Sequence, residues 1–298
     1  MAKKKFYRPI LYVLLMTARG FFSLLPFKVG FMFGGFLGKL AFYCIPKEKK
    51  KTLANLRLAF GAEKTEKELE AIGARVFQNY GYMAAELALI DKLIPRLEKI
   101  VSMQGIELMD AALKRGKGVL GVLAHFGNWE LMGGTVSLLG YPVHCIARKI
   151  YYDKYDKRLI ELRSKMNVHT IYREESLRAV PRALKHNDVV GIVADQDVET
   201  VGGVFVEFFG KPAYSMVAPV RFAMATGAAV IPIFMIREGL HHRMIIEPPL
   251  ELVDTGDREK DLVTNTQQWV TIQEKYIRQY PHLWVWNHKR WKTRPVLL

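Results

Sequence analysis

From about residue 100 onward, short aliphatic stretches alternate with longer stretches whose apolar residues recur at helical spacing. Such short stretches without a polar side are typical of strands buried on both faces of a sheet. Parallel strands need a crossover between them, and a helix supplies it. The alternation therefore predicts an α/β fold with a mostly parallel central sheet flanked by helices. We expect strands near residues 119–124, 142–147, 168–172, 188–194, 229–236 and 242–247, and helices near 107–115, 128–139, 154–166, 176–186, 215–227 and 259–279.

The expected strand 119–124 is followed by a histidine, His125, and five residues later by a glutamate, Glu130. On one continuous helix, two residues at this spacing lie about 140° apart. Their side chains can therefore meet only if His125 lies on a turn before the helix begins, and Gly127 and Asn128 provide such a turn. The spacing predicts a histidine at the carboxyl end of a strand and a carboxylate in the first turn of the next helix.

A histidine beside a carboxylate, here His125 beside Glu130, can act as a general base. The carboxylate fixes the tautomer of the imidazole and stabilises the imidazolium that forms when the ring takes up a proton. In a protein without catalysis, the same pattern is a buried histidine and a glutamate favoured in the first helical turn by the macrodipole. No serine or cysteine occupies the nucleophile position of a Gly-x-Ser-x-Gly motif. The attacking group is then a substrate hydroxyl or water, so transfer and hydrolysis both remain open.

Further charged residues follow other expected strands, and the carboxyl ends of parallel strands gather at one edge of a sheet. Asp195 ends the strand near 188–194, and its carboxylate could hold the second ring nitrogen of His125. Asp197 is a second acidic candidate for substrate binding, with the capping of a turn as the alternative. Arg148 follows a strand and Arg163 lies on the next helix; they could bind phosphate or an acidic carrier protein. A solvated helix face is the other interpretation.

The positive charge of the chain is concentrated at its N-terminal end. Residues 1–61 hold twelve Lys or Arg, beginning with Lys3–Lys5, and one acidic residue, Glu48, so they carry +11 of the total charge of +15. These cations interrupt long apolar stretches and do not form a separate polar face. That pattern suits an anionic membrane surface better than nucleic acid, so we expect no nucleic-acid partner.

Residues 1–46 are predicted to be helical and to associate with a membrane. Three cations between residues 19 and 39 leave no window of about 20 apolar residues, which disfavours a simple spanning helix. A pair of interfacial or re-entrant helices broken near Pro26 fits better, and a buried helical hairpin is the alternative. We expect a catalytic domain to follow over residues 47–298.

The sequence predicts no metal site. Cys44 and Cys145 lie in apolar contexts and have neither metal-binding nor disulfide spacing. His241 and His242 are adjacent on an expected strand, where their side chains would point to opposite faces. Close to the C-terminus, the segment 280–291 carries three tryptophans beside Lys289 and Arg290, a combination that suits a membrane interface.

Four short segments occur in an order that is specific when they are taken together. They are Asn55–Phe60, Ala124–Glu130, Ala194–Asp197 followed by Phe208–Pro212, and Ala228–Pro232. These segments resemble those of the late lipid A acyltransferases, the lauroyl and myristoyl transferases, a branch of the lysophospholipid acyltransferase superfamily. The resemblance runs from about residue 20 to 295. Glutamate instead of aspartate at the second position of the His-x4-acid motif, here Glu130, favours this branch.

The resemblance implies a membrane-associated acyltransferase at the cytoplasmic face of the cell inner membrane. The donor would be an acyl thioester of acyl carrier protein or coenzyme A, the acceptor a hydroxyl of a glycolipid such as a lipid A precursor, and no cofactor would be needed beyond the donor. His125 and Glu130 would carry the catalysis. The family also associates an arginine after the motif with the site, which we assign to Arg163 first and to Arg148 next.

Two other functions fit the same residues. A thioesterase would use the same base on water, and a non-enzymatic protein would bind membrane surfaces through its basic N-terminal residues, with His125 incidental. Product analysis with a labelled acyl thioester separates the three, because they give an acylated lipid, a free fatty acid or neither.

Overall fold

The computed structural model describes residues 7–295, and it confirms the expected α/β fold with a mostly parallel central sheet. The expected basic cluster Lys3–Lys5 lies outside the described residues. The seven-stranded sheet has the order β1-β9-β8-β2-β5-β3-β4, and its pairs are parallel except for β8 with β9. Its strands are β1 Val101–Gln104, β2 Val119–Leu123, β3 Val143–Ala147, β4 Val168–Tyr172, β5 Val189–Val193, β8 Ala229–Glu238 and β9 His241–Ile246.

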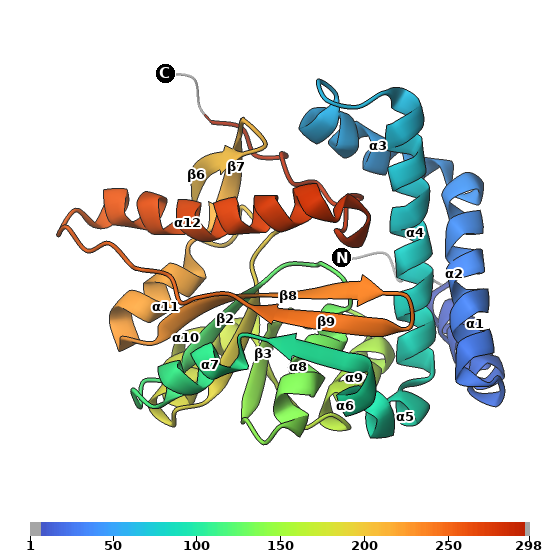
Figure 1. The fold of residues 1–298 in the computed structure, drawn as a ribbon, viewed down its shortest axis with the longest axis horizontal. Coiled ribbons are helices and arrows are strands. Elements are labelled where there is room, and N and C mark those ends of the chain that lie inside the picture. Colours follow the sequence, from blue (N-terminus) through green and yellow to red (C-terminus); the bar gives the residue numbers. More distant parts are fainter. Residues whose placement is uncertain (1–6, 296–298) are drawn as a thin grey trace.

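Helices cover both faces of the sheet, and each face has its own hydrophobic core (Figure 1). One face is covered by α10 Ser176–Lys185, α11 Ala218–Thr226 and α12 Arg258–Gln279, which contribute Val180, Phe222 and Trp269 to its core. The other is covered by α7 Ile106–Leu113, α8 Trp129–Leu138 and α9 Asp153–Ser164. The strands between these layers are aliphatic along their length because neither side of the sheet faces water.

A two-stranded antiparallel hairpin stands beside the sheet. It consists of β6 Gly203–Phe208 and β7 Lys211–Met216. Phe209 and Gly210 form its turn with positive φ angles of 53° and 65°. The hairpin leaves the sheet after β5 and returns the chain to α11, so it lies near the carboxyl ends of the parallel strands.

The N-terminal part is helical, as expected, with a break near Pro26 between the first two helices. These are α1 Tyr7–Leu24 and α2 Phe27–Cys44. Within residues 7–295, no single helix is both long and apolar enough to cross a membrane. The consecutive helices α2 and α3 Pro46–Phe60, bent by 88° at their junction, reach that length and composition only as a pair.

Helix α2 packs closely on α4 Glu66–Ala88, which begins at the capping box of Thr65 and Glu68. The close approach depends on glycines, since a Cβ atom on Gly81 would lie 2.1 Å from the carbonyl oxygen of Gly34. One side of α2 is buried in this way. The other side of α2 and much of α1 expose large apolar side chains, namely Ile10, Leu11, Val13, Leu14, Leu15, Phe21, Leu24, Val29, Met32, Phe33, Phe36, Leu37 and Leu40.

The expectation that the tryptophan-rich segment lies at a membrane interface is wrong. Trp284 and Trp286 are fully buried, and Trp291 is 7% exposed. Their rings pack against aromatic side chains of the hairpin and of α3, including Phe208 and Phe60. Arg290 is buried as well and donates to the backbone oxygen of Tyr214. The segment is part of the core, because indole rings fill a protein interior as well as they fill an interface.

Candidate active site

His125 lies on the turn between β2 and α8, as the sequence predicts, and its ring is held by Asp195. The His125 Nδ1 atom lies 2.6 Å from Asp195 Oδ1, and the His125 backbone N–H donates to Asp195 Oδ2 at 2.9 Å. Asp195 follows β5, the neighbour of β2 in the sheet, so the parallel register brings the two residues together. The indole Nε1–H of Trp284 also donates to Asp195 Oδ2, at 2.8 Å. Asp195 is fully buried.

The buried carboxylate sets the protonation behaviour of the histidine. Burial lowers the pKa of His125, but the charge of Asp195 and its hydrogen bond outweigh burial, so the pKa is raised above its usual 6.5. Burial likewise raises the pKa of Asp195, and the charge and hydrogen bonds of His125 more than reverse this, so the carboxyl stays ionised. A carboxylate at Nδ1 leaves Nε2 as the proton acceptor of the neutral ring.

The turn that carries His125 is fixed on a second side by the C-terminal segment. The Val285 backbone N–H donates to the His125 carbonyl oxygen at 3.1 Å, and the Gly127 N–H donates to the carbonyl oxygen of Leu283 at 2.9 Å. Gly127 has a φ of +63°, and a Cβ atom there would lie 1.9 Å from the Met235 carbonyl oxygen. Only glycine therefore fits this turn.

Glu130 lies in the first turn of α8, as expected, but the structure pairs it with Arg163 instead of His125. Arg163 donates from Nε and Nη2 to the two carboxylate oxygens of Glu130 at 2.9 and 2.8 Å. Both side chains are largely buried, at 12% and 10% exposure. The expected role of Glu130 as the carboxylate at the histidine ring thus falls to Asp195. The charge of Glu130 still contributes to the raised pKa of His125.

A pocket of about 380 Å³ joins most of the predicted site residues. His125, Glu130, Arg148 and Arg163 line it, together with Arg173 and Gln196. The rest of its wall is apolar except for Ser176 and comes from Trp129, Ile146, Ala147, Leu159, Ser176, Ile192, Val193, Val198, Val201, Met216, Ala218 and Phe222. We call this the histidine pocket. Among residues 7–295, no group of three or more His, Cys, Asp or Glu side chains is arranged to hold a metal ion.

Asp197 does not line the histidine pocket. Its two carboxylate oxygens accept hydrogen bonds from the backbone N–H and the hydroxyl of Thr293, both at 2.7 Å. The residue therefore anchors the C-terminal segment, which is neither of the two roles expected from the sequence, since Thr293 is 96 positions away. Trp284, by contrast, was not among the predicted site residues. Nothing in its sequence context distinguishes a ligand of Asp195 from an interfacial tryptophan, since the two residues are 89 positions apart.

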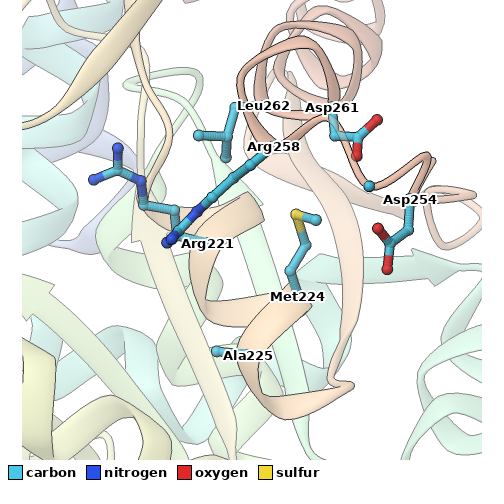
Figure 2. A pocket seen from close by; sticks show the side chains of 8 residues that line it. Arg221, Met224, Ala225, Asp254, Arg258, Asp261 and Leu262 are labelled. Atoms are coloured by element: carbon cyan, nitrogen blue, oxygen red, sulfur yellow. The ribbon is translucent and has the colours of Figure 1, made fainter.

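A second cavity, of about 320 Å³, lies between α11 and α12 (Figure 2). Helix α11 separates the two cavities, with Phe222 facing the histidine pocket and Arg221 and Met224 facing the second one. Arg258, Asp254 and Asp261 complete its polar lining, so cations and carboxylates are mixed there. No histidine lines this cavity, and we assign it no chemistry.

Comparisons with known proteins identify the family of the chain. The family model described as bacterial lipid A biosynthesis acyltransferase matches residues 2–293. The chain is 28% identical to the lipid A biosynthesis palmitoleoyltransferase of Escherichia coli K12 and 27% identical to its lauroyltransferase, in each case over 91% of this chain and 88% of the relative. It is also 26% identical to a phosphatidylinositol mannoside acyltransferase of Mycobacterium tuberculosis, over 67% of this chain and 62% of that protein. The chain therefore belongs to the bacterial lipid A biosynthesis acyltransferase family and is an acyltransferase enzyme.

Proposed function

We propose that this enzyme moves a fatty acyl chain from an acyl thioester to a hydroxyl of a glycolipid, with His125 as the general base. His125 Nε2 takes the hydroxyl proton while the hydroxyl oxygen attacks the thioester carbonyl carbon. The tetrahedral intermediate then collapses by breaking the carbon–sulfur bond. The leaving thiolate takes the proton back from the imidazolium, so an ester and a free thiol are the products.

The observation that carries this proposal is a histidine poised as a base in a pocket without an activated nucleophile of the protein. Ser176 is the hydroxyl-bearing residue among those that line the histidine pocket, and its hydroxyl donates to the Arg173 carbonyl oxygen instead of to His125. The base is therefore free to act on a hydroxyl that belongs to the substrate. The relatives are named as a lipid A biosynthesis palmitoleoyltransferase and a phosphatidylinositol mannoside acyltransferase, which supports a glycolipid acceptor.

The backbone at the start of α8 can stabilise the oxyanion of the tetrahedral intermediate. The first N–H groups of a helix have no intrahelical acceptor and carry the positive end of its dipole. Here they are the N–H groups of Trp129 and Glu130, directly after the turn that carries His125. The apolar wall of the histidine pocket suits an acyl chain, whereas Arg148 and Arg173 suit a phosphate or an acidic carrier protein.

We expect Arg163→Lys to lower kcat by about tenfold, because an ammonium group cannot reproduce the bidentate grip on Glu130. Glu130→Gln should have a similar effect. Each substitution breaks the ion pair between residues 130 and 163, so the side chain at position 130 can move in the histidine pocket. Steady-state kinetics with donor and acceptor varied in turn measure both effects. The matched control is Arg158→Lys on the same helix, since Arg158 pairs with the more exposed Glu161. Equal kcat values for the wild type, Arg163→Lys, Glu130→Gln and Arg158→Lys would show that Arg163 makes no contribution to catalysis.

The donor and acceptor meet this enzyme, in our proposal, at the cytoplasmic face of the cell inner membrane. The exposed apolar sides of α1 and α2 would face the lipid, and the basic residues of the N-terminal part would contact anionic headgroups.

Whether residues 1–46 form a unit separate from 47–298 stays a prediction. Phe42 of α2 belongs to the same hydrophobic cluster as the sheet, so the two parts share a core.

High salt should weaken the attachment of the full-length protein to anionic vesicles without releasing it. At about 1 M salt, charges are screened beyond roughly 3 Å, but burial of apolar side chains in lipid persists. The double substitution Leu14→Glu with Phe36→Glu should release the protein. Leu177→Glu on α10 is the matched control, because Leu177 is an exposed leucine outside α1 and α2. Complete release by salt alone, measured by vesicle flotation, would contradict the apolar contact.

The function is tested by mass analysis of the products. Full-length protein is incubated with a lipid A precursor and an isotopically labelled acyl group on either acyl carrier protein or coenzyme A. We expect the label in the glycolipid, and the ratio of rates identifies the preferred carrier. Labelled free fatty acid without acylated lipid would establish a thioesterase instead. Vesicle binding without either product would leave only a membrane-surface function.

A further inference from the structure

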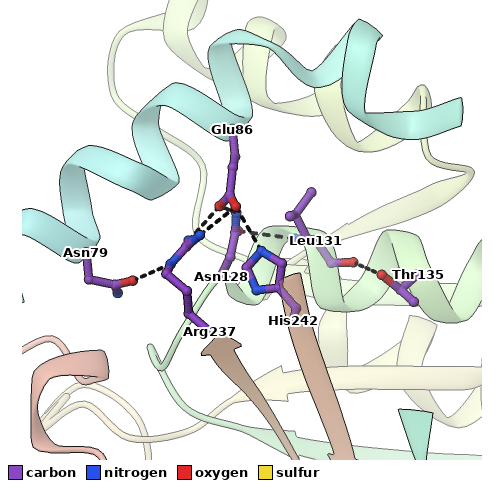
Figure 3. A network of polar contacts seen from close by, with 7 residues as sticks. All are labelled: Asn79, Glu86, Asn128, Leu131, Thr135, Arg237 and His242. Atoms are coloured by element: carbon purple, nitrogen blue, oxygen red, sulfur yellow. Dashed lines mark hydrogen bonds and ion pairs between the residues drawn. The ribbon is translucent and has the colours of Figure 1, made fainter. Parts of the chain in front are cut away.

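A cluster of buried charges around Glu86 lies beside the first turn of α8 (Figure 3). The Glu86 side chain, on α4, is fully buried. Arg237 on β8 donates from Nη1 and Nη2 to its two oxygens, both at 2.6 Å, and His242 Nε2 on β9 lies 2.8 Å from Oε1. Burial raises the pKa of Glu86, but the charge and hydrogen bonds of Arg237 outweigh burial and lower the pKa to about 2. Glu86 is therefore an anion with a fixed orientation.

The third partner of Glu86 is Asn128, which belongs to the turn after His125. The Asn128 Nδ2 group donates to Glu86 Oε2 at 2.8 Å. Its Oδ1 atom accepts a hydrogen bond from the Leu131 backbone N–H at 3.3 Å and so caps α8. One side chain thus connects the first turn of α8 to a carboxylate anchored on three other elements. Asn128 is itself fully buried, so water does not replace either bond.

We propose that Asn128 and Glu86 are positioning residues for acyl transfer. The hydrogen bond between them sets the direction of the first turn of α8, and thereby aims the N–H groups of Trp129 and Glu130 at the oxyanion of the intermediate. This inference rests on the proposed transfer reaction and assigns the Glu86 cluster a part in it. Neither residue lines the histidine pocket, so each acts through the backbone of α8.

The geometry requires an amide at position 128. Capping needs an acceptor for the Leu131 N–H, and the link to Glu86 needs a donor to an anion. Aspartate caps helices as well as asparagine does, but it has no proton to donate and would place a second negative charge beside Glu86. The other sides of the turn are already fixed, by Asp195 at His125 and by Leu283 at Gly127. Without the hydrogen bond to Glu86, the end of the turn at residue 128 and the first turn of α8 are free to rotate.

The test compares single and paired substitutions in the full-length enzyme. Asn128→Asp should lower kcat by about 10- to 100-fold with donor and acceptor KM nearly unchanged, because the helix cap stays and only the aim of the N–H groups is lost. Glu86→Gln combined with Asn128→Asp reverses the direction of the bond, since the glutamine amide can donate to the new carboxylate. The net charge of the cluster is also restored. We expect this pair to recover part of the lost kcat and not all of it, because Arg237 Nη2 also donates to Glu86 Oε2 and loses that acceptor when an amide NH₂ group takes its place.

Asp261→Asn is the matched control for a general loss of stability. Asp261 is a buried carboxylate that holds the backbone N–H and hydroxyl of Thr255, away from α8. This variant should lower the melting temperature while kcat per folded molecule stays unchanged. If Asn128→Asp does not fold, Asn128→Ser tests the same link. Serine keeps the helix cap but is too short to reach Glu86, so this variant should also lower kcat by about 10- to 100-fold.

Two results would overturn the inference. One is a folded Asn128→Asp or Asn128→Ser enzyme with kcat within about twofold of the wild type. The other is a folded double variant of Glu86 and Asn128 that recovers none of the lost kcat, since the link would then not matter. Failure of the proposed function is recognised separately, because the wild-type enzyme would then form no acylated lipid.

Discussion

His125→Ala is expected to lower the rate of acyl transfer by about 10² to 10⁴, with the fold intact. The substitution removes the proton acceptor for the substrate hydroxyl, and general base catalysis contributes about this factor. The backbone of the turn stays fixed, because the Asp195 carboxylate still accepts from the residue 125 N–H and from Trp284. The measurement is the initial rate of labelled acyl-lipid formation, with circular dichroism to verify the fold.

A second histidine in the same sheet provides a matched control. His144 on β3 pairs with Asp188 at 2.8 Å, and its side chain is 20% exposed, close to the 23% of His125. His144→Ala therefore removes a histidine–aspartate pair outside the histidine pocket, formed through Nε2 and with a less buried aspartate, and it should leave kcat unchanged. Near-native turnover by folded His125→Ala enzyme would exclude His125 as the base.

Asp195→Asn should be almost as severe, with a loss of about 10² to 10⁴ in kcat, because it forces the wrong tautomer of His125. The Oδ2 atom of Asp195 accepts from two fixed N–H donors, those of the His125 backbone and the Trp284 indole. In the asparagine variant the carbonyl oxygen must therefore take this place. Its amide NH₂ group then faces His125 Nδ1, which becomes an acceptor, so that Nε2 carries the proton and cannot remove another.

Asp188→Asn is the corresponding control for this substitution, since it changes the aspartate of the other pair. A kinetic measurement with each enzyme at saturating donor and acceptor gives kcat directly. If Asp195→Asn retained more than about a tenth of the wild-type kcat in a folded protein, the tautomer argument would be wrong. Asp195 would then serve only to hold the turn.

The sequence predicted the sheet and the turn well because both are local patterns. Six aliphatic stretches became strands within a few residues of the expected bounds, and Gly127 and Asn128 form the turn that the spacing of His125 required. The strand β1 was missed, since its four residues, Val101–Gln104, are too short to show a pattern. A mostly parallel sheet was expected, but the sequence analysis did not predict that β8 and β9 are the antiparallel pair.

The partners within the site were harder to predict because they depend on distant parts of the chain. The spacing of His125 and Glu130 places both at one turn, but the rotation of α8 directs the glutamate toward Arg163 on α9. Asp195 was expected near the ring of His125 as a partner additional to Glu130, since the carboxyl ends of parallel strands gather at one edge. The structure places it at Nδ1, without Glu130 at the ring. Trp284 was taken for an interfacial residue because amphipathic rings suit an interface and a polar core equally.

The pH dependence of kcat/KM tests the central claim most directly, namely that His125 is the base and that Asp195 sets its basicity. The base must be neutral, so the rate rises as the pH increases through the His125 pKa, which lies above 6.5 in the wild-type enzyme. Loss of the Asp195 charge lowers this pKa, and the acidic limb of the residual activity of Asp195→Asn should move to lower pH. The control Asp188→Asn should keep the wild-type limb. An acidic limb that stays in place in Asp195→Asn would contradict the account.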